Sequence, residues 1–502
     1  MTFRPLTSTP TRRWWPVPCL LTVGTALALL TGASAPASAT GGPAQRAATP
    51  TPSATTTASA PVGWITTADG LRRVAPLATA ELQPSTAPSA VRIAIDVASR
   101  YQQMDGFGAA LTESSAHLLM SLSPSARTAA LRSLFDPQTG AGIHLLRLPL
   151  GASDFALSRY SYDDLPAGQT DPQLARFSLA HDDTEIVPVL QQALQINPAL
   201  RVMGTPWSAP GWMKTSGSLI GGTLAPGSTD VYAQYLARTV QALRSRGVPL
   251  RFLTLQNEPG YSPGDYPGMR LSAAQESALA VALAPKLAAA GLGDVQLFGY
   301  DHNWDDTAYP TALLADPAAS AVLSGTAFHC YAGKPGAQDA VHAAAPDKDV
   351  WFTECSGGSW APSFAGNLGW NAGTLAVGAT RAWSRSVLFW NLALDPAGGP
   401  HTGGCSGCRG VLTITPRTGK VVRNVEYDVL ALAGRAVRAG ATRIGSPTGL
   451  YGVQTVAYEN PDGSRVLTAY NSWGSNQSLL IDDGTQRVGA PLPAGSVVTV
   501  RW

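Results

Sequence analysis

The segment Phe252-Leu-Thr-Leu-Gln-Asn-Glu-Pro259 is a short apolar run followed at once by polar side chains. Similar apolar runs recur before and after this segment, separated by longer Ala-rich and Leu-rich helical segments such as 231–246 and 273–290. The eight predicted strands are 105–111, 144–148, 201–205, 252–255, 295–300, 326–329, 350–353 and 386–390. Strands that alternate with helices in this way predict a parallel (β/α)8 TIM barrel over residues 101–420.

Polar side chains follow the carboxyl ends of these strands. Right-handed crossovers bring all of the strand ends to one face, which is where barrel active sites lie. The residues at these positions are Arg147, Trp207, Asn257, Glu258, Asp301, His302, His329, Tyr331, Glu354, Trp390 and Asn391. Taken singly, each has a plain structural interpretation: His329 suits a satisfied core histidine equally well, and tryptophans are more often core than sugar platform. Their shared position at successive strand ends favours one site.

Glu258 and Glu354 follow the fourth and seventh strands, so they face each other across the barrel mouth. Glycosidic cleavage needs two carboxyl groups, one to protonate the leaving oxygen and one at the anomeric carbon. A separation of about 5 Å permits direct attack and retention of configuration. A buried carboxyl near a second one has a raised pKa, which keeps one of them protonated. We therefore predict a retaining glycoside hydrolase with Glu258 as acid/base and Glu354 as nucleophile.

Neighbouring residues have predicted supporting roles. Arg147 and Tyr331 are expected to hold Glu354 ionised, although Arg147 also suits a core salt bridge. Asn257 is placed to bond the sugar 2-hydroxyl. The predicted substrate-binding set is Asp154, Trp207, Asn257, His329, Tyr331, Trp390 and Asn391. No loop has the ligand spacing of a calcium site, and no metal or cofactor is expected.

The two ends of the chain differ from the barrel region. Residues 1–39 have a basic start, an apolar stretch and a small-residue run ending at Ala39, which predicts a secretory signal peptide and a secreted, extracellular protein. An uncleaved anchor is the alternative, and no later segment is apolar enough to span a membrane. Residues 40–61, rich in Thr, Pro, Ala and Ser, predict a linker. Alternating patterns in 62–100 and 421–502 predict one antiparallel β-sandwich formed from both chain ends.

Composition narrows the class of partner. Hydrophobic residues make up 45% of the chain and charged residues 14%, which suits a large folded core. The 35 Lys and Arg include Arg4, Arg12 and Arg13 of the predicted signal, so 32 basic and 33 acidic residues remain, a net charge of −1. That balance argues against a nucleic-acid partner. A carbohydrate or glycolipid substrate is expected instead.

Four cysteines remain after the predicted cleavage, and an oxidising compartment permits disulfides between them. Cys405 and Cys408 lie in one Gly-rich loop, where a local bridge is predicted as a possibility. Cys330 and Cys355 suit either a bridge or two buried thiols, because spacing alone does not decide between them.

From about residue 62 to 502 the chain resembles glycoside hydrolase family 30, the glucosylceramidase-like enzymes. The matching segments are Asp105-Gly-Phe-Gly-Ala-Ala-Leu-Thr112, Arg147-Leu-Pro-Leu-Gly-Ala-Ser-Asp-Phe155, Thr205-Pro-Trp-Ser-Ala-Pro-Gly-Trp-Met-Lys-Thr215, Gln256-Asn-Glu-Pro259, Phe328-His-Cys-Tyr331, Thr353-Glu-Cys355 and Trp390-Asn-Leu-Ala-Leu394. The resemblance implies a barrel with an attached β-sandwich, the same two catalytic glutamates and no cofactor. It also implies sugar contacts at Asp154, Trp207, Asn257 and Trp390.

The loops bear on the substrate. Gly299-Tyr-Asp-His-Asn-Trp304, Cys355-Ser-Gly-Gly-Ser-Trp360 and the loops 261–269 and 405–408 look more like bacterial and fungal members than animal lysosomal glucosylceramidases. The first expectation is a glucosylceramidase-type enzyme that cleaves β-glucosidic bonds, and the alternative is an endo-β-1,6-glucanase. A catalytically silent carbohydrate-binding protein is a remote third reading, because both carboxylates are present.

Overall fold

The computed structural model describes residues 60–85, 87 and 89–502. The signal peptide predicted at 1–39 lies outside the described residues, as does the linker predicted at 40–61 except for its last two residues. No helix in the described part of the chain is long and apolar enough to cross a membrane.

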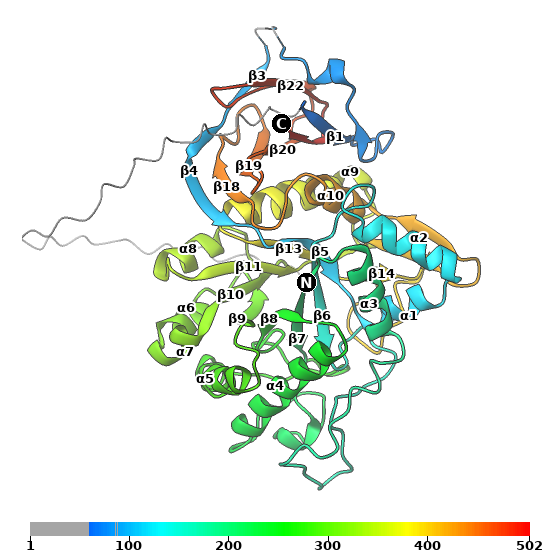
Figure 1. Ribbon diagram of the computed structural model, residues 1–502, viewed down its shortest axis with the longest axis vertical. Coiled ribbons are helices and arrows are strands. Elements are labelled where there is room, and N and C mark those ends of the chain that lie inside the picture. The colour runs from blue at the N-terminus through cyan, green and yellow to red at the C-terminus, as the bar shows by residue number, and fades with distance from the viewer. Residues whose placement is uncertain (1–59, 86, 88) are drawn as a thin grey trace, which may run out of the picture. The chain divides into compact units, whose positions relative to one another are not determined.

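Eight parallel strands form the barrel (Figure 1), in the order β11-β10-β9-β8-β7-β6-β5-β13. They are β5 (Gly106–Ala110), β6 (Leu145–Leu150), β7 (Arg201–Pro206), β8 (Leu250–Thr254), β9 (Gln296–Asn303), β10 (Leu323–His329), β11 (Asp349–Glu354) and β13 (Ser386–Phe389). The sheet closes between β13 and β11, where Val350 bridges Ser384 and its oxygen accepts from Arg385 N at 2.8 Å. The predicted barrel is confirmed, and each predicted strand overlaps an observed one.

Helices cover the outside of the barrel strands (Figure 1). They are α1 (Glu113–Met120), α2 (Pro124–Phe135), α3 (Ile186–Ile196), α4 (Thr229–Ser245), α5 (Ala273–Ala289), α6 (Ala308–Ala315), α7 (Pro317–Val322), α8 (Ala337–Ala344) and α9 (Phe364–Gly369), which continues into a π-helical segment, Trp370–Ala379. Local sequence explains where α5 starts: the Ser272 hydroxyl accepts from Gln275 N, and Gln275 Oε1 accepts from Ser272 N. This reciprocal capping satisfies two amides that the helix itself leaves unpaired.

The barrel interior is filled by side chains, so the lower part is a core and not a pore. One apolar residue from each of β6 to β11 and β13 points inward to form a layer, Leu145, Met203, Phe252, Phe298, Ala327, Trp351 and Leu388. Phe298 and Trp351 stack at 3.5 Å between ring centroids. Because the interior is filled, a ligand site is expected at the carboxyl ends of the strands, where barrel active sites lie.

The β-sandwich is built from both chain ends, which confirms that prediction. A seven-stranded sheet runs β2-β1-β23-β20-β19-β18-β4 and faces a three-stranded sheet, β22-β21-β3. The strands are β1 (Val62–Thr66), β2 (Ala75–Pro76), β3 (Val91–Ala94), β4 (Asp96–Gln103), β18 (Thr442–Gly445), β19 (Val453–Glu459), β20 (Arg465–Asn471), β21 (Gln477–Asp482), β22 (Arg487–Leu492) and β23 (Val497–Arg501). One buried cluster, which includes Ile93, Leu479 and Val500, joins the two sheets.

A helix interrupts the segment 421–502, for which only strands were predicted. Residues Val425–Gly434 form α10, and every one of its residues is buried. Such uniform burial removes the apolar–polar periodicity by which a helix is recognised in a sequence. The remaining strands, β12 (Gly357–Gly358), β14 (Ala393–Leu394), β15 (Cys408–Arg409), β16 (Leu412–Thr415) and β17 (Lys420–Arg423), form two small sheets.

Candidate active site

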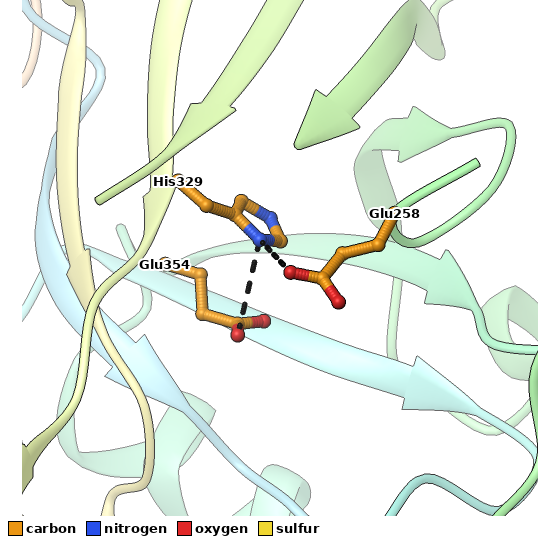
Figure 2. Close-up of side chains that lie close together, drawn as sticks. All are labelled: Glu258, His329 and Glu354. Carbon is orange, nitrogen blue, oxygen red and sulfur yellow. Dashed lines mark hydrogen bonds and ion pairs between the residues drawn. The ribbon is translucent and has the colours of Figure 1, made fainter. Parts of the chain in front are cut away.

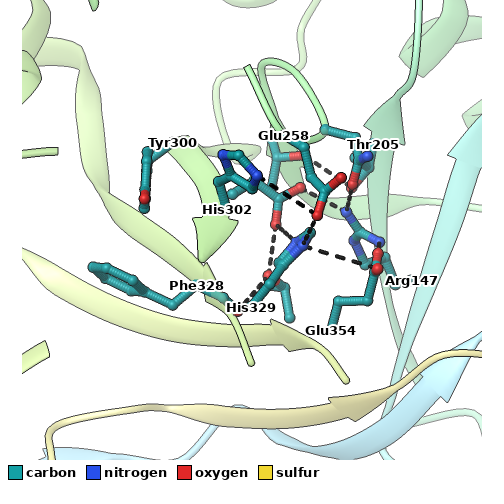
Figure 3. Close-up of polar contacts among 12 residues, drawn as sticks. Arg147, Thr205, Glu258, Tyr300, His302, Phe328, His329 and Glu354 are labelled. Carbon is teal, nitrogen blue, oxygen red and sulfur yellow. Dashed lines mark hydrogen bonds and ion pairs between the residues drawn. The ribbon is translucent and has the colours of Figure 1, made fainter. Parts of the chain in front are cut away.

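The polar residues predicted at the strand ends meet at the mouth of the barrel (Figure 3). Arg147 lies within β6 and Asp301 within β9, while His329 and Glu354 are the last residues of β10 and β11. Glu258 follows β8 in a loop. The parallel register of the strands brings these side chains, distant in sequence, to one place.

Glu258, His329 and Glu354 form the centre of the site (Figure 2). One oxygen of each carboxylate and one ring nitrogen of His329 all lie within 4.8 Å of one another. The two carboxylates are therefore near the separation of about 5–5.5 Å that is typical of retaining glycosidases. The wider spacing of inverting enzymes, which leaves room for a water molecule, is about 6.5–9.5 Å.

Glu354 is held from two sides. Its Oε2 accepts from Arg147 Nη1, and its Oε1 accepts from Tyr331 Oη at 2.8 Å. Arg147 has no exposed surface, and its Nη2 donates to Asn257 Oδ1 and to Asp301 Oδ2, each at 2.7 Å. Desolvation of the hydroxyl group within the site and the charge of Glu354 raise the pKa of Tyr331 well above its ordinary value, so the phenol remains a donor although the residue is partly exposed.

Glu258 reaches the site from an unusual backbone conformation. Its φ is +47°, a region that residues other than glycine rarely adopt, and its amide donates to Asp301 O at 3.0 Å. Its Oε1 accepts from His329 Nδ1 at 3.1 Å and lies 3.8 Å from His302 Nε2. The sharp turn after β8 thus directs the carboxylate towards Glu354.

Asp301 and His329 form a buried ion pair that supports the glutamates. Asp301 accepts from His329 Nε2 at 3.0 Å and from Thr353 Oγ1 at 2.5 Å. Although burial opposes it, the charges of Arg147 and His329 hold the pKa of Asp301 well below its ordinary value. Burial alone would lower the pKa of His329, but the charges of Glu354 and Asp301 raise it to about 9. The ring is therefore protonated at neutral pH, and both nitrogens donate.

The contacts of His329 distinguish between its two predicted roles. The sequence places His329 in the substrate-binding set, with a satisfied core histidine as an equal alternative, and the structure favours the alternative: the ring is fully buried and each nitrogen is hydrogen-bonded to a carboxylate. A side chain without exposed atoms supports the carboxylates and does not touch a sugar. Asp301, which the sequence places at a strand end without a role, completes this support.

The pKa values of the two glutamates shift in opposite directions in the free site. Burial raises the pKa of Glu354 above its ordinary value, and the charge of Glu258 adds to the rise against the opposing charges of His329 and Arg147. Burial acts in the same sense on Glu258, but the hydrogen bond from His329 and the charges of His329, His302 and Arg147 together outweigh it and lower the pKa. This is the reverse of the expected order. Two carboxyl groups this close titrate as a pair, so the pKa shifts in the free site do not assign the acid and the nucleophile. The position of each carboxyl group relative to a bound substrate assigns them.

The predicted aromatic and amide contacts are only partly at the cavity. Trp207 and Trp390 stack at 5.1 Å between ring centroids, and Trp390 lines the cavity. Asn257 is 7% exposed and accepts from Arg147. Asn391, predicted to contact substrate, is fully buried outside the cavity lining, and its side-chain amide has no partner among the described residues.

Asp154 belongs to the predicted substrate-binding set. It lines the cavity, is 8% exposed, and its Oδ1 is buried without a hydrogen-bond partner among the described residues. Burial and the charge of Glu354 raise the pKa of Asp154 well above its ordinary value. The raised pKa favours the protonated form of this carboxyl group, which can donate a hydrogen bond.

The cavity around the glutamates has a volume of about 450 Å³. Residues of three loops line it in addition to those predicted, Tyr261, Asp265, Tyr266, Ser356, Trp360, Gly404, Cys405 and Cys408. Tyr261, Tyr331 and Trp360 are 46% to 59% exposed. The sequence offers one indication of these three residues, since each is an aromatic residue in a loop that follows a predicted strand.

The two pairs of cysteines form disulfides, Cys330–Cys355 and Cys405–Cys408.

Glu258, His329 and Glu354 have side chains of the kinds that bind metal ions, and they lie close together. The His329 ring, protonated on both nitrogens, has no free lone pair for a metal ion, and Glu354 already accepts a hydrogen bond from Arg147. The chemistry of the group therefore suits acid–base and nucleophilic work.

Comparison with known proteins gives the family. Residues 104–404 match the glycosyl hydrolase family 30 TIM-barrel domain, and residues 440–500 match the β-sandwich domain of the same family. The chain belongs to glycosyl hydrolase family 30. This family 30 protein is a glycoside hydrolase.

Two kinds of curated relative are similar to this family 30 enzyme. An endo-1,6-β-D-glucanase of Trichoderma harzianum is 34% identical, over 83% of this chain and 87% of the relative. Lysosomal acid glucosylceramidase of Mus musculus is 27% identical, over 81% and 82%. A solved endo-β1,6-glucanase structure superposes with a TM-score of 0.82 at 30% identity, covering 88% of this chain and 99% of that one.

Proposed function

We propose that this family 30 enzyme is a retaining endo-β-1,6-glucanase, with Glu258 as acid/base and Glu354 as nucleophile. Three relatives named endo-1,6-β-glucanases are 31% to 34% identical to the chain, whereas four relatives named glucosylceramidases are 26% to 27% identical. The higher identity to the glucanases favours an endo-β-1,6-glucanase, which was the alternative in the sequence analysis, over the glucosylceramidase-type enzyme that was expected first. The observation that carries the mechanism is the close approach of the two carboxylates, within 4.8 Å.

In the first step, a Glu354 oxygen attacks the anomeric carbon while Glu258 gives its proton to the leaving glycosidic oxygen. The carbon–oxygen bond to the leaving sugar breaks, and a covalent glycosyl–enzyme ester forms on Glu354. Arg147 and Tyr331 hold Glu354 in place for the attack. Positive charge develops on the sugar ring in the transition state, and the carboxylate of Glu354 stabilises it as the new bond forms.

In the second step, Glu258 acts as a base. It takes a proton from a water molecule, whose oxygen attacks the anomeric carbon and displaces Glu354, so that configuration is retained overall. Esterification has removed the charge of Glu354, and the protonated His329 then stabilises the ionised form of Glu258. The Glu258–His329 hydrogen bond therefore serves the step that needs a base.

The cavity rim supports a polymeric substrate. Tyr261 and Trp360 are 47% and 59% exposed and line the same cavity as the glutamates. Flat, exposed aromatic faces suit stacking against sugar rings, and two of them beside the site offer places for further glucosyl units. A substrate with more than one sugar unit is needed to contact both aromatic side chains.

The test compares pustulan, a β-1,6-glucan, with glucosylceramide in detergent and a 4-nitrophenyl β-glucoside. We expect gentio-oligosaccharides of mixed length from pustulan, at a kcat/KM about 100-fold or more above that for glucosylceramide. Proton NMR of the first product should show the β-anomer. Efficient turnover of glucosylceramide without release of oligosaccharides from pustulan would reject the glucanase assignment.

We also propose that the enzyme is exported. The support is the pattern of residues 1–39, with its basic start, apolar stretch and small residues before Ala39. The mature N-terminus of the secreted protein, measured by mass spectrometry, is expected near residue 40. A cell-associated protein that still carries Met1 would contradict this.

A further inference from the structure

A short disulfide-closed turn forms one wall of the active-site cavity. Cys405 and Cys408 are bridged across three positions, and both line the cavity together with Gly404. Cys408 is buried in an aromatic cluster with Phe155 and Trp390, and Cys405 packs against the same cluster. The bridge thus lies against the aromatic residues of the site.

The turn is attached to the segment that carries Asp154. Thr402 donates to Asp154 O twice, from its amide at 2.8 Å and from its hydroxyl at 3.2 Å. Gly404 approaches so closely that a Cβ added there would lie 2.8 Å from Asp154 Oδ2, and its φ is +70°. Only glycine fits this contact without displacing the carboxyl group.

The same turn is attached to the loop that follows Glu258. Gly404 N donates to Asp265 Oδ2 at 2.9 Å. Asp265 is held in turn by Arg159, whose Nη2 donates to Asp265 O at 2.7 Å. Tyr266 packs beside the disulfide in the aromatic cluster.

A third attachment reaches the loop that follows Glu354. Strand β12 pairs with β15, so that Gly358 lies opposite Cys408, and Ser359 N donates to Gly407 O at 2.8 Å. The turn therefore touches the loops after β6, β8 and β11. The first carries the candidate sugar-binding acid Asp154, the second carries Glu258, and the third begins directly after Glu354.

We propose that the Cys405–Cys408 turn is a positioning element that sets the sugar-binding wall of the cavity by holding Asp154 and the Asp265 loop in place. The inference rests on the proposed function and adds the elements that determine how tightly the glucosyl unit is bound. Contacts made equally in the ground state and the transition state affect KM more than kcat. Loosening the turn should therefore weaken sugar binding while chemistry at Glu258 and Glu354 continues.

The first experiment replaces both cysteines, C405S/C408S. On the aryl β-glucoside we expect KM to rise about tenfold with kcat changed far less, because small displacements of a positioned group are costly. Tm should fall by about 2 °C or less, since a three-position bridge constrains little of the unfolded chain. An unchanged KM, or a kcat that falls as much as kcat/KM, would overturn the proposal.

A matched pair at Asp265 tests the same wall with the disulfide intact. Asp265→Ala removes the acceptor for Gly404 N and should raise KM, whereas Asp265→Asn keeps an oxygen acceptor and should restore it. Gly404→Ala should raise KM through its clash with Asp154. These variants test the inference even if C405S/C408S fails to fold. Equal KM values for Asp265→Ala and wild type would contradict it.

A further experiment reduces the Cys405–Cys408 disulfide with dithiothreitol. Its two thiols reduce the bridge by exchange, giving two cysteine thiols and the cyclic oxidised reagent. We expect KM to rise, and then to recover when the reagent is removed and oxidised glutathione reoxidises the two thiols, which re-forms the bridge and gives two molecules of reduced glutathione. The C405S/C408S variant in dithiothreitol reports the separate effect of reducing Cys330–Cys355. A rise in KM of the same size in that variant would assign the effect to the other bridge and overturn the proposal.

A binding measurement separates this inference from the proposed function. Gentiobiose is titrated into Glu354→Gln protein, with and without the C405S/C408S change, and followed by tryptophan fluorescence. Weaker binding with the cysteines replaced supports the wall, and identical binding overturns it. Failure of the proposed function has a different signature: the Glu354→Gln protein does not bind gentiobiose, and wild type does not cleave pustulan.

Discussion

At the scale of residues, the site depends on one chain of charges. Arg147 lies between Glu354 and Asp301, and Asp301 pairs with His329, which donates to Glu258. Arginine and protonated histidine together offset the negative charge of three carboxylates that would otherwise repel one another in a buried place. The cost of burying these groups is lowered because each has a partner.

Replacing Glu354 by glutamine should remove nearly all turnover, since the amide is not a nucleophile. Loss of about 10³-fold or more in kcat is expected. Azide should rescue Glu354→Ala by forming a glycosyl azide of inverted configuration. As the contrast, Glu258→Ala should retain activity best on aryl glycosides with good leaving groups, whose first step needs little acid assistance, while the second step becomes slow because it needs Glu258 as a base. Near-wild-type hydrolysis by Glu354→Gln would show that another group is the nucleophile.

His329 predicts an alkaline limb in the pH profile. Its pKa is raised from 6.5 to about 9, so the positive charge is fully present below pH 6.5 and is lost as pH rises through 9. The carboxylates it supports then lose a donor and a compensating charge. We expect kcat to decline near pH 9 in wild type and a lower, flatter profile in His329→Gln. A wild-type limb that survives unchanged in the variant would assign it to another group.

At the scale of elements, α5 supports the strand end that carries Asp301. Glu276, on α5, is fully buried, and its Oε1 accepts from Tyr300 N at 3.1 Å. Tyr300 and Asp301 both have positive φ, 72° and 52°. A buried helix side chain thus holds a bend that no local sequence preference favours.

Glu276 should make stability depend on pH. Burial raises its pKa to about 8, so its contribution to the free energy of unfolding is fully present below about pH 4.5 and is lost as pH rises through 8. Glu276→Gln has no such charge to form. We expect the Tm of the variant relative to wild type to be higher at pH 9 than at pH 5, measured by calorimetry. A difference that does not change with pH would contradict the shift.

At the scale of the whole molecule, one apolar cluster runs through barrel and sandwich. It contains Phe107 and Leu146 of the barrel, Leu432 of α10, and Val456 and Tyr458 of β19. The Tyr458 hydroxyl also donates to Thr380 Oγ1, at 3.2 Å. Shared burial of this kind couples the stability of two domains.

Barrel and sandwich should therefore unfold in one transition. Tyr458→Ala is expected to lower the free energy of unfolding by about 3–5 kcal/mol, as for other large buried aromatics, and to do so for both domains together. Tyr458→Phe, which removes only the hydrogen bond, should cost about 1 kcal/mol. Circular dichroism and tryptophan fluorescence in urea should give coincident curves. Two separated transitions in wild type would show that the domains unfold independently.

Short-range pattern was enough to predict the barrel, because each strand is an apolar run that ends in polar residues. It was also enough to place Glu258 and Glu354 at one face, since parallel strands share their direction. It did not separate His329 from the sugar-binding residues. A histidine at a strand end is the same in sequence whether its ring faces a cavity or two carboxylates. The helix α10 was missed because full burial leaves it without periodicity.

The order of elements and the candidate reacting groups could be predicted from the amino-acid sequence, because both depend on local runs of residue types. The distances between those groups, the protonated state expected of His329, and the wall formed by Gly404, Cys405 and Cys408 became visible only in three dimensions. Charge, burial and close contact depend on neighbours in space. Those neighbours come from loops as far apart along the chain as Asp154, Asp265 and Ser359.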